Sequence, residues 1–479
     1  MTPPDLSARA RWLAFAVLCM GDLMIVLDST IVNVALPTIR AHLGFSEAAL
    51  VWVVNGYLLT FGGFLLLGGR LADLYGQRRV FLAGVVLFTL ASLACGLATS
   101  APLLVVARAV QGLGGAVVSA VSLSLIMNLF PDGPERVRAM GYFGFVMAGG
   151  GSVGVLLGGL LTAIDWRAIF LVNIPVGAAV IVLAMRLLPA SGRRPGEVRL
   201  DLAGAATVTL SILIAVYAIV SAEAVGWGSA RTLGMLAAAV LLMLVFVAVE
   251  ARASAPLVPL RLFRIRNLVV ANLVSVLWAA AMFAWFFLSA LYMQLVLGYG
   301  PMQVGLAFLP SNLIMGAFSY SLSARLVTRF GIRLPMAVGL CVAALGLVLF
   351  GLAPADGGFV AHVLPAMLLL GVGAGMAFNP MLLAAMSDVS PHESGLASGV
   401  VNTGFMMGGS LGLAVLASLA AGRTGAALAA GAGEAEALTA GYHAAFFLGA
   451  ACAAAAGLLG GLCLRPRPAG EAAAPVAVH

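Results

Sequence analysis

The stretch GRLADLYGQR, residues Gly69–Arg78, recurs in altered form as ARLVTRFGIR, residues Ala324–Arg333. Both stretches contain Arg-Leu, then an aromatic-Gly pair and a final Arg, at an offset of 255 residues. A second pattern, GxxxGxxxG, recurs at an offset of 254 residues, and it is formed by Gly150, Gly154 and Gly158 and again by Gly404, Gly408 and Gly412. Because two independent landmarks share nearly one offset, we expect two parallel halves of similar structure.

The composition indicates a membrane protein. The 479 residues are 62% hydrophobic and 9% charged, with a mean hydropathy of +1.11, whereas soluble domains carry roughly 25% charged residues. The net charge of +7 comes from arginines in short loops between apolar runs, which does not suggest a nucleic-acid partner. The five cysteines lie singly in apolar runs, so the sequence predicts no metal site.

Fourteen apolar runs are long enough to cross a bilayer, which takes about 20 residues of helix. Backbone polar groups must be satisfied inside lipid, so these runs are predicted helices. The runs cover residues 12–36, 49–69, 80–99, 102–129, 138–162, 166–187, 201–221, 231–250, 267–297, 303–324, 334–353, 360–382, 395–421 and 440–464.

The repeat makes spans 1–6 and 9–14 equivalent, with spans 7 and 8 inserted between them. The predicted fold is therefore an all-α integral membrane protein with two six-helix bundles and two inserted helices. We assign residues 1–190 to the first bundle, 191–266 to the inserted helices with their linkers, 267–465 to the second bundle, and 466–479 to a tail.

The arginines predict the orientation of the chain in the membrane, because cytoplasmic loops carry an excess of basic residues. With the N-terminus in the cytoplasm, the outer segments hold four arginines, Arg40, Arg167, Arg231 and Arg423. Arg108 lies within a span, so the remaining twenty of the 25 basic residues fall on the inner side. We expect a multi-pass protein of the cytoplasmic membrane, with both termini in the cytoplasm.

The first span holds two acids, Asp22 and Asp28, and the fourth holds Arg108. Ionisable residues inside a span are functional candidates. Asp28 and Arg108 lie about 12 Å and about 9 Å from the outer ends of their helices, so they can meet. Burial raises the pKa of a carboxyl group and a nearby arginine lowers it, and this competition makes a proton switch. The alternatives are a structural role for Asp28 or Asp22 and a packing role for Arg108.

The loop GGRLADLYGQRR, residues Gly68–Arg79, joins the second and third spans on the cytoplasmic side. Its glycines allow a tight turn, and its aspartate can pair with the arginines or with a facing helix N-terminus. We expect a cytoplasmic gate, the alternative being a rigid turn with positive-inside charges. The gate residues are Gly69, Asp73, Gly76, Arg78 and Arg79.

The glycine stripes of spans five and thirteen predict close helix packing, to which Gly159 adds a further small residue. Aromatic and amide side chains inside the spans are candidates for a substrate cavity, because aromatic faces attract lipophilic cations. Packing against lipid or other helices is the alternative. The candidates are Asn33, Tyr57, Gln111, Trp278, Trp285, Phe286 and Gln294.

Catalysis and ATP hydrolysis have no signature in this chain. There is no Ser-His-Asp or Cys-His arrangement, and no Walker-type segment. We therefore expect no enzyme activity and no cofactor, with protons as the coupling ion.

Several motifs resemble the major facilitator superfamily, in its fourteen-span drug:proton antiporter branch. These are LDSTIVNVALP (Leu27–Pro37), the loop Gly68–Arg79, RAVQGLGGA (Arg108–Ala116), DWRAIFLVNIPVG (Asp165–Gly177), LYMQLVLGYGPMQVGLAFLP (Leu291–Pro310) and SGLASGVVNTG (Ser394–Gly404). The resemblance covers nearly the whole chain. It implies alternating access by two rocking bundles, export driven by proton influx, coupling through Asp28 and Arg108, and a monomeric unit in lipid.

Two positions depart from the pattern of that branch. Val155 stands where the antiporter motif has proline, and Thr328 stands where the second copy of the gate loop would repeat Asp73. Asp22 is not part of the motif, and it fits either a substrate of positive charge or a second coupled proton. The sequence thus predicts an exporter of amphipathic, cationic drugs or antibiotic-like metabolites. A facilitator or a proton-coupled importer of a small metabolite is the alternative.

Overall fold

The computed structural model describes residues 7–130, 133–189, 201–253, 256, 258–318, 322–389 and 394–465, and every regular element in these residues is a helix. The N-terminal half holds α1 (Ala8–Leu43), α2 (Glu47–Tyr75), α3 (Gln77–Gly96), α4 (Ala101–Leu129), α5 (Gly133–Ile164), α6 (Ala168–Leu171) and α7 (Asn173–Leu187). The inserted hairpin is α8 (Leu202–Val225) and α9 (Ala230–Arg252), followed by η1 (Leu260–Arg264). The C-terminal half holds α10 (Arg266–Leu291), η2 (Tyr292–Val296), α11 (Pro301–Ala317), α12 (Ser323–Phe330), α13 (Arg333–Phe350), η4 (Phe359–Val363), α14 (Leu364–Met386), α15 (Ser394–Ala429) and α16 (Glu434–Cys463).

The predicted all-α membrane fold is confirmed. Twelve helices of the described chain are long and apolar enough to cross a membrane. Two predicted spans fall outside that set: α11 has 17 residues, and the count includes α5, a helix of 32 residues, only over its described segment Val153–Ile164. Each of the fourteen predicted runs nevertheless coincides with one helix or with two consecutive short ones, such as α6 and α7.

The two glycine stripes occupy equivalent places in the two halves. A Cβ atom on Gly158 of α5 would lie 2.8 Å from the carbonyl oxygen of Ile31 on α1, and Gly150 and Gly154 face the same helix. In the second half, a Cβ on Gly408 of α15 would lie 2.9 Å from the Cα of Val276 on α10, and Gly404 and Gly412 also face α10. Small residues therefore let α5 approach α1, and α15 approach α10, at backbone distance.

This packing predicts unequal effects of alanine along one helix. Gly158→Ala should destabilise the protein by about 1–3 kcal/mol, the usual cost of overpacking. Gly151→Ala is the matched control, because its added methyl group would meet only Thr30, at 4.0 Å. Thermal unfolding of the two purified variants in detergent measures the difference. Equal melting temperatures would contradict close packing of α5 on α1.

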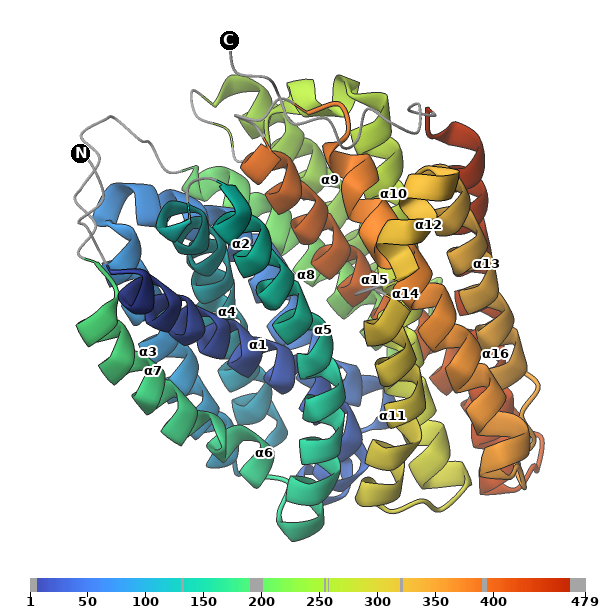
Figure 1. Cartoon of the computed structure of the whole chain (residues 1–479). Coiled ribbons are helices and arrows are strands. Elements are labelled where there is room, and N and C mark those ends of the chain that lie inside the picture. Colours follow the sequence, from blue (N-terminus) through green and yellow to red (C-terminus); the bar gives the residue numbers. More distant parts are fainter. Residues whose placement is uncertain are drawn as a thin grey trace.

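We call the end of the bundle where α1 begins and α16 ends the terminal end, and the opposite end the far end (Figure 1). The two halves touch at the far end. Gln294 of η2 donates a hydrogen bond to the carbonyl of Val34 on α1, at 2.9 Å. Gly159 of α5 lies against Pro301 of α11. These contacts join the two halves at the far end in this conformation.

The helices α2 and α15 form a second contact between the halves. Asn55 of α2 donates to the carbonyl oxygen of Ser410 on α15, at 3.0 Å. Nearer the terminal end, a Cβ on Gly62 would lie 2.9 Å from the Cβ of Met406. The contact between these two helices therefore extends beyond the far end.

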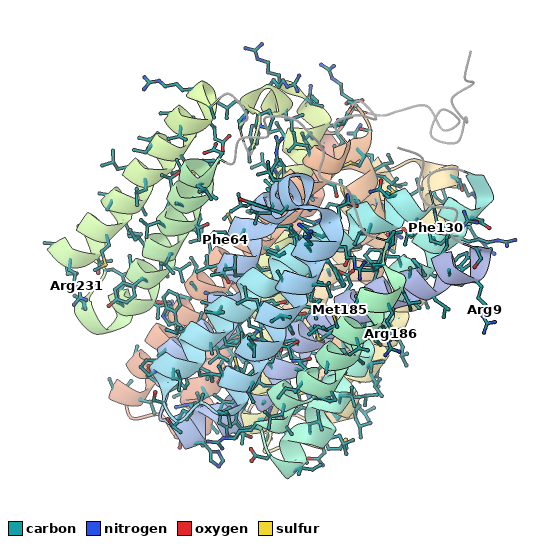
Figure 2. The ribbon with its side chains drawn as sticks, turned by 90° about the vertical axis from the view of Figure 1, so that its left-hand side faces the viewer. Arg9, Phe64, Phe130, Met185, Arg186 and Arg231 are labelled. Atoms are coloured by element: carbon teal, nitrogen blue, oxygen red, sulfur yellow. The ribbon has the colours of Figure 1, made fainter. Side chains whose placement is uncertain are left out.

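The inserted hairpin lies at one side of the bundle, with Arg231 near its turn (Figure 2). Ser211 of α8 donates to the carbonyl of Ala239 on α9, at 2.7 Å, which holds the two helices together. Ser418 of α15 donates to the carbonyl of Ile219, at 3.3 Å. The hairpin is thus attached to the bundle through α8, while much of α9 is exposed, as expected for a helix that faces lipid.

Candidate functional site

A buried ion pair joins the first and fourth helices. The Arg108 Nη1 atom lies 2.5 Å from Oδ2 of Asp28. Each residue is 1% exposed. The two residues were predicted to lie at similar depth, and the structure brings them into direct contact. Because removing either charge would leave the other buried and unpaired, the pair is sensitive to protonation of Asp28.

An amide on α4 supports the pair. Gln111 lies three residues after Arg108, on the same face of the helix, and its Nε2 donates to Oδ1 of Asp28 at 2.7 Å. Its Oε1 accepts from Nη1 of Arg108 at 2.6 Å. Gln111, which the sequence analysis placed among the cavity candidates, therefore contacts both members of the pair.

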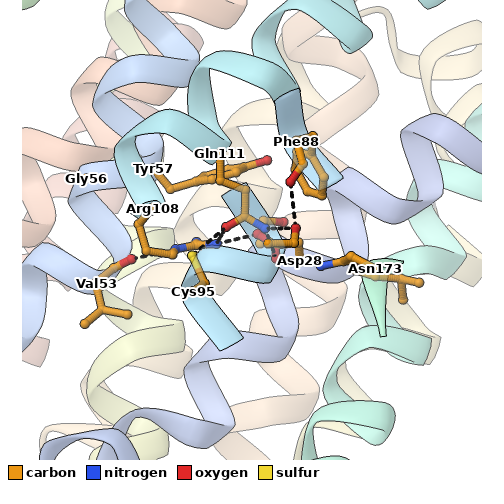
Figure 3. A network of polar contacts seen from close by, with 12 residues as sticks. Asp28, Val53, Gly56, Tyr57, Phe88, Cys95, Arg108, Gln111 and Asn173 are labelled. Carbon is orange, nitrogen blue, oxygen red and sulfur yellow. Dashed lines mark hydrogen bonds and ion pairs between the residues drawn. The ribbon is translucent and has the colours of Figure 1, made fainter. Parts of the chain in front are cut away.

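Two further helices, α3 and α7, complete the Asp28 network, which we define as Asp28, Ser92, Arg108, Gln111 and Asn173. Figure 3 shows Asp28, Arg108, Gln111 and Asn173 close together. Asn173 of α7 donates to Oδ1 of Asp28 at 3.1 Å, and Ser92 of α3 accepts from Gln111 at 2.8 Å. From α2, the carbonyl of Val53 accepts from Nε of Arg108 at 2.9 Å. Sequence reasoning missed these three partners, although Asn173 lies within the motif Asp165–Gly177.

Aromatic rings cover the guanidinium group. The Arg108 Cζ atom lies 4.5 Å from the ring centroid of Tyr57 and 5.7 Å from that of Phe170. Both distances are within the range of a cation–π interaction. Tyr57 thus lies beside the network, and Figure 3 shows its ring next to Arg108.

The network links an ionisable side chain to helix packing. Protonation of Asp28 would remove the charge that holds Arg108, and would turn one acceptor oxygen into a donor. The donors from α4 and α7 would then lose an acceptor. Binding or release of one proton can therefore change how α1 packs against these two helices.

Asp22 lies outside the network. It is 1% exposed, and no hydrogen bond of full donor–acceptor geometry reaches its two oxygens among the described residues. The hydroxyl groups of Ser119 and Ser122 on α4 face it and interact with its charge.

The predicted gate loop is a sharp turn between α2 and α3. Gly76 has φ +92° and serves as the cap of both helices. Arg78 donates to the carbonyl of Met185 on α7, and Arg79 is exposed. Gly69 has no neighbour within 4 Å of an added Cβ, and the side chain of Asp73 lies outside the described residues. The gate role therefore stays a prediction.

Gly76 allows a direct test of that turn. Gly76→Ala should lower the unfolding free energy by about 1–2 kcal/mol, because an L-residue is strained at this positive φ. Transport should fall with it if the turn is part of the gate. The measurement is transport by cells at matched protein level, with thermal unfolding of the purified variant alongside. Unchanged transport in a destabilised protein would leave the turn with a structural role alone.

The remaining cavity candidates lie in packed surroundings. Trp285 and Phe286 of α10 pack against Phe308 of α11, and Trp278 is fully buried. Asn33 donates to the carbonyls of its own helix, at Ser29 and Thr30. Gln294 belongs to the far-end contact described above. Their place in a substrate cavity stays a prediction.

Comparison with known proteins identifies the family of this chain. The profile described as Major Facilitator Superfamily matches residues 18–413. The chain belongs to the major facilitator superfamily. The cephamycin export protein CmcT of Amycolatopsis lactamdurans is 41% identical over 407 residues, which cover 84% of each chain. The puromycin resistance protein pur8 of Streptomyces alboniger is 40% identical over 422 residues, covering 88% of this chain and 84% of the other.

Solved structures agree on the fold. A bacterial homolog of the human lysosomal transporter Spinster superposes with a TM-score of 0.67 at 17% identity, covering 97% of this chain and 100% of that chain. The xylose transporter XylE from E. coli superposes with a TM-score of 0.61 at 15% identity, covering 96% and 97%. The chain is thus a multi-pass membrane protein with the architecture of this superfamily.

Proposed function

We propose that this protein is a proton-coupled antiporter that exports amphipathic drugs or antibiotic-like metabolites by alternating access. The observation that carries the proposal is the buried pair of Asp28 and Arg108, held by donors from α4 and α7. Support for the substrate class comes from relatives described as export and resistance proteins for cephamycin, puromycin and tetracenomycin C. Cationic amphipaths are the substrates we expect first, as the sequence predicted.

Protons are the coupling ion in this proposal. In one conformation Asp28 takes up a proton from the outer side, and Arg108 loses its partner. In the other conformation Asp28 releases the proton to the cytoplasm and pairs with Arg108 again, as in the structure. Contacts that join the halves at the far end, such as the one from Gln294 to Val34, would break when the protein opens outward.

The proposal also includes the membrane, the orientation and the partners of the protein. The protein is a monomer in the cytoplasmic membrane with both termini in the cytoplasm, so the far end faces outward. It carries no resident cofactor, and its partners are a lipophilic small molecule and the surrounding lipid.

Inverted membrane vesicles test the proposal. Wild-type vesicles and vesicles lacking the protein receive a proton gradient and a panel of lipophilic dyes and antibiotics. The proposal predicts that at least one compound accumulates in wild-type vesicles and that a protonophore abolishes the accumulation. Equal movement with and without the gradient would contradict it and would favour the facilitator alternative.

A further inference from the structure

The carboxylate of Asp22 is buried without a positively charged partner among the described residues. No hydrogen bond of full geometry reaches either oxygen there, and the ion pairs of these residues do not include Asp22. An unpaired carboxylate in a buried site is among the costliest groups in a protein, and it becomes neutral unless a partner compensates the charge. The charge of Asp22 must therefore be compensated by a positively charged group or neutralised by a proton.

The groups around Asp22 cannot supply the positive partner. The hydroxyls of Ser119 and Ser122 face it from α4, Tyr57 faces it from α2, and Cys19 lies one turn away on α1. None of these carries a positive charge. On α4, the cation nearest along the chain is Arg108, which is already engaged by Asp28, Gln111 and the carbonyl of Val53.

The helices pack closely around this part of α1. Both carboxylate oxygens of Asp22 are buried from solvent. At the adjacent residue, a Cβ on Gly21 would lie 3.2 Å from the ring of Phe81 on α3 and 3.6 Å from Val118 on α4. From α5, Gly150 packs against Leu23. Contacts from α3, α4 and α5 thus surround the part of α1 that carries Asp22, and a proton is the smallest ligand that could compensate its charge there.

Asp22 and Asp28 are separate sites. Six residues of helix place them about 9 Å apart along α1. The oxygens of Asp28 are engaged by Arg108, Gln111 and Asn173, while no hydrogen bond of full geometry reaches those of Asp22 among the described residues. The hydroxyl of Tyr57, which lies within electrostatic reach of both acids, has no hydrogen-bond partner in the described chain.

We propose that Asp22 is a second proton-binding site that fills and empties once in each transport cycle, so that the exporter moves two protons for each substrate molecule. This inference rests on the proposed function. Each carboxylate takes one proton from the outer side to become a carboxylic acid, and gives that proton to the cytoplasm to become a carboxylate again. The two sites differ in what compensates their charge: Arg108 does so for Asp28, and the proton itself does so for Asp22.

The first test measures the ratio of protons to substrate. Purified protein is reconstituted in liposomes, and the combination of pH gradient and membrane potential that stops net flux of a neutral substrate is determined. We expect a ratio of two for the wild type and one for Asp22→Asn. Cys19→Ser, one turn away and without a change of charge, should keep the ratio of two.

A second test does not require transport. Infrared difference spectra of the purified protein are recorded over a pH titration, to follow the carbonyl stretch of protonated carboxylic acids. Asp22→Asn should remove one acid band that Asp28→Asn leaves in place, and Asp22→Glu should restore a shifted band. This measurement decides the matter even if Asp22→Asn is inactive.

The outcomes are distinct. A wild-type ratio of one, an unchanged ratio in Asp22→Asn, or the absence of an Asp22 acid band would each overturn the second proton site while leaving the antiporter intact. Loss of transport for a cationic dye alone, with the ratio for the neutral substrate unchanged, would also overturn it and would make Asp22 a subsite for organic cations. A wild type that moves substrate without any protons would instead refute the proposed function.

Discussion

Asp28→Asn should eliminate accumulation of substrate against its gradient while leaving exchange of substrate down its gradient. Asparagine keeps the size of the side chain and can still accept hydrogen bonds from Gln111 and Asn173, but it cannot take up or release a proton. Asp28 is the only acid in direct contact with Arg108 in the described chain. The substitution therefore removes the group proposed to carry the proton while it keeps the hydrogen bonds from Gln111 and Asn173, although Arg108 loses its counter-charge.

Two assays on one preparation separate these effects. Proton-driven uptake into inverted vesicles should fall to the level seen without a gradient, and counterflow of labelled substrate should continue. Asp356→Asn is a matched control, because Asp356 is exposed in the loop before η4. Full proton-driven accumulation in Asp28→Asn would show that the coupling proton binds elsewhere.

Arg108→Leu should be the most destabilising single substitution at the site. Removing one partner of a buried ion pair costs about 3–5 kcal/mol, because the other charge is left without compensation. The substitution also removes the hydrogen bonds that Arg108 donates to the carbonyl of Val53 and to Oε1 of Gln111. Denaturant unfolding of the purified protein measures the change.

The double variant Asp28→Leu with Arg108→Leu distinguishes charge from packing. Exchanging a whole buried pair for apolar side chains is often close to neutral, so the double variant should regain most of the stability lost in Arg108→Leu. Coupled transport should stay absent in both. A double variant as unstable as the sum of the single ones would show that the two residues stabilise the fold independently.

The fold was predictable because membrane spans and internal repeats leave strong periodic signals. The offset between the stripes of Gly150 and Gly404 predicted two equivalent halves, and the structure places both stripes against the first helix of their half. Span counting succeeded for α6 and α7 together, but could not show that they are two helices. Their boundary depends on local backbone geometry that hydrophobicity does not report.

The site was predictable only in part. Counting residues from the helix ends predicted that Asp28 and Arg108 lie at similar depth, and in the structure they form an ion pair. Depth alone says nothing about which faces of α3 and α7 turn inward, so Ser92 and Asn173 were not found. Asp22 was found by its charge, yet its lack of a positively charged partner among the described residues depends on side-chain placement that no sequence pattern contains.

The most direct measurement of the central claim is proton movement caused by substrate. The purified protein is reconstituted in liposomes that contain a pH-sensitive dye, and a transported drug is added on one side without any imposed gradient. Antiport through the Asp28 network predicts that the drug drives protons in the opposite direction in the wild type, and that this proton movement disappears in Asp28→Asn. Drug movement without proton movement in the wild type, or equal proton movement in Asp28→Asn, would contradict the account.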